Sequence, residues 1–212
     1  NILSKNYIID FVCFGSFTKR NKKIEKKYKN TNFHIVTFSN LIAFCKIISS
    51  FFLKQPMQVA IFDQPKINDL IKMLLKQNDY DFVHCFLIRS SFILKHQPKA
   101  KLILDAIDSM QLNLKELSFS SNLIFRCIYF YELRLIKFFE SDLKFYYDQI
   151  WSISKRDSKY FQAKSNRKSN VSSFKKAKFK IIPVFINLKN IKIKRKHEDC
   201  ICKIIFSGNL NY

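Results

Sequence analysis

The stretch DFVHCFLIRSSFILKHQPKAKLIL, residues 81–104, decides the fold because it places two short apolar runs on either side of a helix-like segment. Residues 82–87 and 102–104 are nearly continuous in apolar side chains, a pattern typical of strands in a parallel sheet that is buried on both faces. The segment from Ser90 predicts a short helix between them. The stretch therefore indicates strand, helix and strand, the repeating unit of an α/β protein.

The same alternation continues on both sides of this stretch. We expect strands at residues 7–14, 33–38, 150–153 and 181–185, and helices at 40–53, 66–76 and 155–162, the last capped by Ser154. Residues 110–148 predict helix with a break at 118–122, where three serines and an Asn supply a cap. The predicted fold is α/β, a Rossmann-like parallel sheet flanked by helices on both faces.

The composition indicates which classes of partner the chain attracts, but it does not identify one. The chain has 212 residues, is 48% hydrophobic and carries a formal net charge of +22, which attracts anionic lipid, nucleic acid or phosphorylated substrates. A low-GC genome explains the abundance of Lys, Asn, Ile and Phe equally well. The basic segments 19–29, 164–180 and 189–196 are loop-like and lack the interleaved aromatics of a nucleic-acid module, so nucleic acid is not the expected partner.

The cysteines indicate a reducing compartment, since most of them lie in apolar runs: Cys13, Cys45, Cys85, Cys127, Cys200 and Cys202. Cys200 and Cys202 with His197 form only one strand-spaced pair, whereas metal ligands usually come as two spaced pairs, so we expect no metal and no other cofactor. No apolar run reaches the roughly 20 residues of a membrane span. We expect a cytoplasmic protein.

Several polar residues follow predicted strands, where ligands bind in open parallel sheets. Asp105 and Asp108 come after the strand at 102–104, and Arg89 follows the strand at 82–87. A carboxylate there can accept a hydrogen bond from a ligand hydroxyl, and Arg89 can bind phosphate. Equally, Asp108 can cap the helix that begins near residue 110, and Arg89 can pair with an aspartate. We expect His84 to be a core residue.

The end of the chain predicts the opening of a second domain. An apolar run at residues 204–206 leads into Gly208, one of two glycines in the sequence. A glycine after a strand allows backbone N–H groups to approach a phosphate, although a plain turn is the alternative. Because both ends look cut, we interpret the chain as an internal fragment: a domain at 1–188, a linker at 189–200 and the start of a second domain at 201–212.

Five segments in order resemble the N-terminal half of a GT-B glycosyltransferase of family 4, the group-1 type that elongates bacterial surface polysaccharides. They are residues 81–89 (DFVHCFLIR), 104–113 (LDAIDSMQLN), 150–154 (IWSIS), 180–183 (KIIP) and 206–212 (FSGNLNY). The resemblance covers nearly the whole chain. It also implies that the family's first strand precedes residue 1, and that the acidic residues and basic pair of the donor site follow residue 212.

The resemblance implies a hexosyltransferase that moves a sugar from a nucleotide-sugar donor to a lipid-linked or polysaccharide acceptor. Asp108 and Asp105 would be catalytic, Arg89 and Asn113 would bind acceptor or phosphate, and Gly208 with Asn209 would border the donor. Residues 183–187 (PVFIN) depart from the family's Pro-Asn-Gly turn. We expect the fragment alone to be inactive.

The basic surface would hold the protein at the inner face of an anionic membrane. For the aromatic residues at 129–131 and 138–139 we favour the core over the membrane interface. The alternative function is a non-enzymatic basic module that binds nucleic acid or anionic membrane. A decayed or split gene product is compatible with the transferase interpretation.

Overall fold

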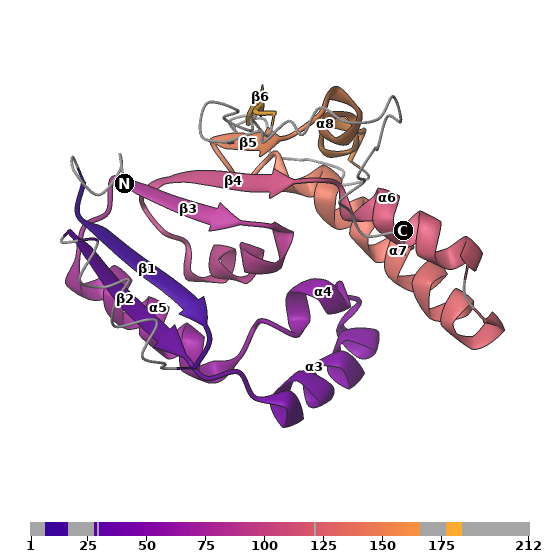
Figure 1. The fold of residues 1–212 in the computed structure, drawn as a ribbon, viewed down its shortest axis with the longest axis horizontal. Helices are drawn as coiled ribbons and strands as arrows, with labels where there is room; N and C mark the ends of the chain where they lie inside the picture. Colours follow the sequence, from indigo (N-terminus) through magenta and orange to yellow (C-terminus); the bar gives the residue numbers. More distant parts are fainter. Residues whose placement is uncertain (1–6, 17–27, 29, 121, 166–176, 184–212) are drawn as a thin grey trace, which may run out of the picture. The chain divides into compact units, whose positions relative to one another are not determined.

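The computed structural model describes residues 7–16, 28, 30–120, 122–165 and 177–183. The chain divides into two compact units, Asn1–Tyr80 with Arg89–Pro98, and Asp81–Ile88 with Lys99–Tyr212. Each described part consists of parallel strands and helices, so the predicted α/β class with a Rossmann-like parallel arrangement is confirmed (Figure 1).

The first unit contains a parallel strand pair and helices. Strands β1 (Ile9–Phe14) and β2 (Thr31–Val36) pair in register from Ile9 with Thr31 to Phe14 with Val36. They are followed by α3 (Asn40–Leu53), the short α4 (Met57–Ala60) and α5 (Pro65–Gln77). The 3-10 segment η1 spans Ile88–His96. Helix α5 begins with Pro65, which suits the first helical turn, and buries one face through Ile67, Ile71 and Leu74.

The second unit is built on a parallel sheet with the strand order β3-β4-β5-β6 among the described residues. Its strands are β3 (Phe82–Phe86), β4 (Lys101–Ile107), β5 (Gln149–Ser152) and β6 (Lys178–Ile181). Helix α8 (Lys155–Gln162) packs against β5 and β6, and α7 (Leu123–Leu143) packs against α8 and α6 (Met110–Ser120). The predicted helix break at 118–122 is confirmed.

The core of this unit lies on one face of the sheet. Leu102, Leu104 and Ala106 of β4 are buried, as is Ile150 of β5, which pairs with Leu104; Ile136 of α7 is buried as well. The residues between them in β4 are less buried, so burial alternates along the strand. The sequence predicted strands buried on both faces, but in this unit only one face of β4 is fully buried.

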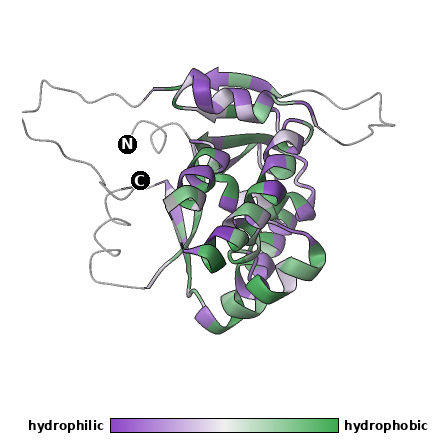
Figure 2. Cartoon of the chain, turned by 90° about the vertical axis from the view of Figure 1, so that its right-hand side faces the viewer, coloured by the Kyte–Doolittle hydropathy of each residue, from purple (hydrophilic) through white to green (hydrophobic). Residues whose placement is uncertain are grey.

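Two predictions of burial are wrong. His84 is exposed rather than a core residue. Of the aromatic residues at 129–131 and 138–139, Phe130 is exposed and the other four are only half-buried, so none belongs to the fully buried core. Apolar residues recur along the helices in Figure 2, where green marks a hydrophobic residue. Apolar character alone did not identify which of them face inward.

Candidate functional site at the carboxyl end of β4

The turn after β4 has an unusual backbone. Ile107 has a positive φ of 60°, and Leu87 at the end of the neighbouring β3 has one of 62°. A β-branched residue such as Ile is rare in this region because its side chain crowds the backbone. Such backbone outliers persist only where surrounding structure holds them, and they concentrate at binding and catalytic sites.

Backbone hydrogen bonds hold this turn against both neighbouring strands. The Leu87 N–H donates to the Asp105 carbonyl at 2.8 Å, and the Ile153 N–H donates to the Ile107 carbonyl at 2.8 Å. The register of β4 with β5 is irregular between Asp105 and Ile107. The Asp108 N–H closes a tight turn onto the Ala106 carbonyl at 2.7 Å. The chain therefore leaves the sheet abruptly at Asp108.

Asp108 lies just beyond the strand end, half-buried, where its Oδ2 atom accepts a hydrogen bond of 3.0 Å from Asn113 Nδ2. The structure therefore brings together two of the residues that the sequence indicated. Asn113 lies in α6, on the first turns of the helix that follows Asp108.

The N-terminus of α6 is capped by other residues than Asp108. Ser109 Oγ accepts from the Gln111 N–H at 3.2 Å, and Glu140 Oε1 accepts from the Met110 N–H at 2.7 Å. These two acceptors satisfy N–H groups that a helix leaves free in its first turn. The expected alternative, in which Asp108 caps this helix, is therefore not what the described hydrogen bonds show.

Glu140 of α7 is a buried carboxylate that the sequence did not single out. Its Oε2 atom accepts from Ser109 Oγ and from Gln111 Nε2, each at 2.7 Å. Burial raises the pKa of Glu140 to about 7, although the hydrogen bonds from Ser109, Gln111 and the Met110 N–H act in the opposite direction. Through these hydrogen bonds Glu140 holds the first turn of α6 in place.

Asp157 of α8 is the second residue that sequence reasoning missed. Its Oδ1 atom accepts from the Ser109 N–H at 3.1 Å, and its Oδ2 atom is hydrogen-bonded by Ser154. The Asp157 N–H in turn donates to Ser154 Oγ at 3.1 Å, so the predicted cap Ser154 is confirmed. Ser109 is therefore held from two helices, and the adjoining Asp108 is positioned through it.

Asp105 lies within β4 rather than after it, which corrects the prediction that both aspartates follow the strand. Its carboxylate is 3.9 Å from His84 Nε2 on the less buried face of the sheet. The His84 ring lies 5.4 Å, centroid to centroid, from the ring of Trp151. Partial desolvation of its ring lowers the pKa of His84, and the nearby Asp105 carboxylate opposes this effect. Asp105 thus belongs to a cross-strand cluster, separate from the contacts of Asp108.

Arg89 lies in the first unit, with its guanidinium carbon 5.6 Å from the centroid of the Phe62 ring. Its Nε atom is buried and has no hydrogen-bond partner in the described part of the chain. A buried donor without a partner is uncommon and is a candidate contact for an anion. The ion pair of Arg89 with an aspartate, the alternative given above, stays a prediction.

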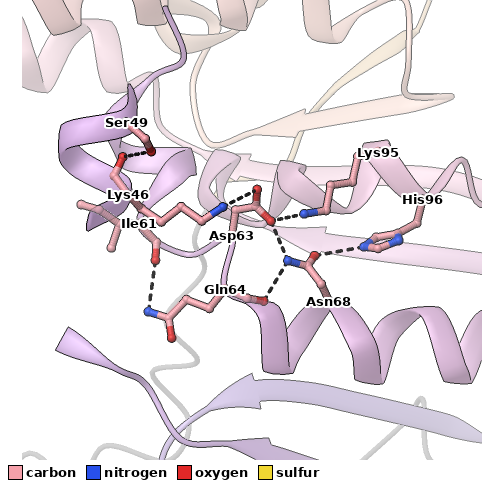
Figure 3. A network of polar contacts seen from close by, with 8 residues as sticks. All are labelled: Lys46, Ser49, Ile61, Asp63, Gln64, Asn68, Lys95 and His96. Carbon is pink, nitrogen blue, oxygen red and sulfur yellow. Dashed lines mark hydrogen bonds and ion pairs between the residues drawn. The ribbon is translucent and has the colours of Figure 1, made fainter. Parts of the chain in front are cut away.

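A second polar network surrounds Asp63 in the first unit (Figure 3). Asp63 forms ion pairs with Lys95 and, at 3.5 Å, with Lys46, and it accepts from Asn68 Nδ2 at 2.7 Å. His96 Nε2 lies 3.0 Å from Asn68 Oδ1. Burial opposes ionisation of Asp63, but the bonds from Lys95 and Asn68 and the lysine charges outweigh it and lower its pKa. This network connects α3, α5 and η1, and we interpret it as structural.

Gly208 and Asn209, the predicted donor-side residues, lie outside the described residues, as do Cys200, Cys202 and His197. Among the residues that the structure describes, no group of three or more metal-ligating side chains is arranged to hold an ion. In that same part of the chain, no helix combines the length and the apolar character needed to cross a membrane.

Comparisons of the chain with models of known protein families, with curated proteins and with solved structures find no match. A functional assignment therefore depends on the residues and geometry of this chain.

Proposed function

We propose that this chain is the acceptor-side half of a glycosyltransferase that moves a sugar from a nucleotide-sugar donor to a lipid-linked or polysaccharide acceptor. The observation that carries the proposal is Asp108, a carboxylate placed just beyond the carboxyl end of β4 and not used as a helix cap. Ligands of open parallel sheets bind at such strand ends.

Asp108 has the properties that an acceptor site needs. Its carboxylate is half-buried and oriented by Asn113, and the backbone that carries it is held by Glu140 and Asp157 through Ser109. In that position an ionised carboxylate accepts the hydrogen bond of an acceptor hydroxyl and increases the nucleophilicity of its oxygen. A group that takes a proton in this way contributes typically 100-fold to 10,000-fold in rate, on the order of 3 to 5 kcal/mol.

Further residues support an anionic donor. The buried Nε atom of Arg89 has no partner in the described residues and suits a phosphate oxygen. The sequence around Gly208 resembles the turn that borders the sugar diphosphate in family 4. The net charge of +22 favours anionic partners in general, including the membrane in which a lipid-linked acceptor resides. We place the reaction at the cytoplasmic face of that membrane.

The test is sugar transfer from labelled nucleotide sugars to a lipid extract, measured with the longest protein that the gene encodes. Asp108→Asn should lower transfer at least 100-fold with little change in donor binding. The matched control is Asp81→Asn. Asp81 is exposed and directly precedes β3, at the amino end of the strand, whereas Asp108 follows the carboxyl end of β4. Equal loss in both variants, or full transfer by Asp108→Asn, would refute the role of Asp108.

The variant Asp105→Asn tests whether Asp105 and Asp108 have different roles in transfer, which the sequence could not decide. Because Asp105 contacts His84 on the sheet face, we expect its loss to affect transfer less than the loss of Asp108. We expect the 212-residue chain alone to show no transfer. Absence of transfer by the longest protein with every nucleotide sugar, together with salt-sensitive RNA binding, would favour the basic-module alternative.

A further inference from the structure

Helix α3 of the first unit exposes most of its large apolar residues and buries two small ones. Only Ala43 and Ser50 of this helix are buried. Six of its eight large apolar residues are exposed, with exposed fractions of 40 to 82%: Leu41, Phe44, Ile48, Phe51, Phe52 and Leu53. Contiguous exposed apolar surface of this kind marks a site of interaction with a protein or a membrane.

The orientation of α3 is fixed by polar contacts at its start and middle. Gln64 bonds both backbone groups of Ser39, accepting from its N–H and donating to its carbonyl, each at 3.0 Å. Lys46 reaches inward to Asp63, which is itself held by Lys95 (Figure 3). Rolling the helix to bury its phenylalanines would break these contacts, so the apolar face stays outward.

The charge of the chain distinguishes between possible occupants of this face. The helix contains no acidic residue, and exposed Lys54 follows directly at its end. A second copy of the chain would bring another net charge of +22 against the first, whereas an anionic bilayer attracts it. Each lysine near anionic headgroups contributes on the order of 1 kcal/mol.

We infer that the exposed face of α3 docks onto an anionic membrane, with the helix lying in the plane of the interface. A helix of 14 residues is about 21 Å long, shorter than the hydrocarbon core of about 30 Å, so it lies on the bilayer and does not cross it. Phe44, Phe52 and Leu41 enter the boundary between headgroups and acyl chains, as in other interfacial helices. The inference is independent of transfer activity, since lipid binding needs no donor.

The experiment is sedimentation of the full chain with vesicles of phosphatidylcholine and phosphatidylglycerol. The double variant Phe44→Ser/Phe52→Ser should bind on the order of 100-fold more weakly, about tenfold for each phenylalanine. Leu123→Ser is the matched control, because Leu123 of α7 is 78% exposed but belongs to the second unit and not to α3. Its binding should equal that of the parent chain. Vesicles of pure phosphatidylcholine should bind the parent weakly.

A second measurement is independent of the serine variants. With Trp placed at position 52 by Phe52→Trp in a Trp151→Phe background, brominated lipids should quench the fluorescence. Unquenched Trp, equal binding by the double variant, or an equal loss with Leu123→Ser would overturn the inference. A dimer that the double variant dissociates, without vesicle binding by the parent, would assign the face to a second copy instead.

Discussion

Replacing Glu140 by Gln tests the buried network that positions the turn after β4. Glutamine keeps the size of the side chain and can still accept from the Met110 N–H, but it has no ionisable proton. The amide of Gln111 can rotate so that its oxygen faces the new amide group. The substitution therefore removes the titration of this site while preserving most of its hydrogen bonds.

The expected magnitude follows from the raised pKa of Glu140, about 7 against an ordinary value of 4.5. Folding favours the protonated form, so the stabilisation is fully present below pH 4.5 and is lost as pH rises through about 7. One unit of pKa difference corresponds to about 1.4 kcal/mol, so ionisation of Glu140 lowers the free energy of unfolding by roughly 3 kcal/mol. Glu140→Gln should lose this dependence on pH.

The assay is urea unfolding followed by the fluorescence of Trp151, the single tryptophan, which lies in β5 of the same unit. The free energy of unfolding of the variant relative to the parent should rise by roughly 3 kcal/mol between about pH 4.5 and about pH 8. The other titrating groups are the same in both proteins, so their contributions cancel in this difference between the two free energies of unfolding. Glu116→Gln, at an exposed position of α6, is the control and should show no such change. The same relative stability of Glu140→Gln at both pH values would refute the reasoning.

Further substitutions test three other features of the structure. Tyr80→Phe removes a 2.7 Å hydrogen bond to Asp10 and should cost about 1 kcal/mol in urea unfolding followed by circular dichroism; unchanged stability would contradict the bond. Asp63→Asn should lower the free energy of unfolding at neutral pH by only about 1 to 2 kcal/mol, because its lysine partners are part-exposed, and this loss should appear as a lower thermal midpoint. Since the pKa of Asp63 is lowered, this cost should disappear as pH falls through its folded value, and a constant cost in acid would oppose the assignment. Ser154→Ala should cost about 1 kcal/mol and Asn122→Ala much less, because only the first side chain makes a cap hydrogen bond; equal costs would contradict this difference.

The sequence predicted the helices most accurately where local signals mark both ends. Helix α3 was expected at 40–53, and α8 at 155–162 after Ser154, and both agree with the structure. Strand boundaries moved more, since β2 begins two residues earlier than expected and β6 begins three residues earlier. Strand ends depend on hydrogen bonds to neighbouring strands, which lie far away in sequence.

Burial was harder to predict than secondary structure. His84 lies in an apolar run, and its neighbours Phe82 and Phe86 are also apolar, so the run appeared buried throughout. All three are exposed, whereas Cys85 between them is buried. The two faces of β3 have similar apolar residues, so composition could not indicate which face carries the core.

The candidate site shows what sequence can and cannot supply. An aspartate just before a helix is equally typical of a cap and of a ligand-binding carboxylate, so Asp108 was ambiguous by position alone. The helix N–H groups decide the question, because Gln111 and Met110 donate to Ser109 and Glu140 instead. Glu140 lies in another helix, 30 residues from Met110, and only tertiary structure reveals the pairing. Its available signal was a carboxylate within an apolar helix, which is costly unless it has donors to accept from. The start of α6 supplies those donors, which compensates the burial of Glu140, and the first N–H groups of the helix therefore do not depend on Asp108.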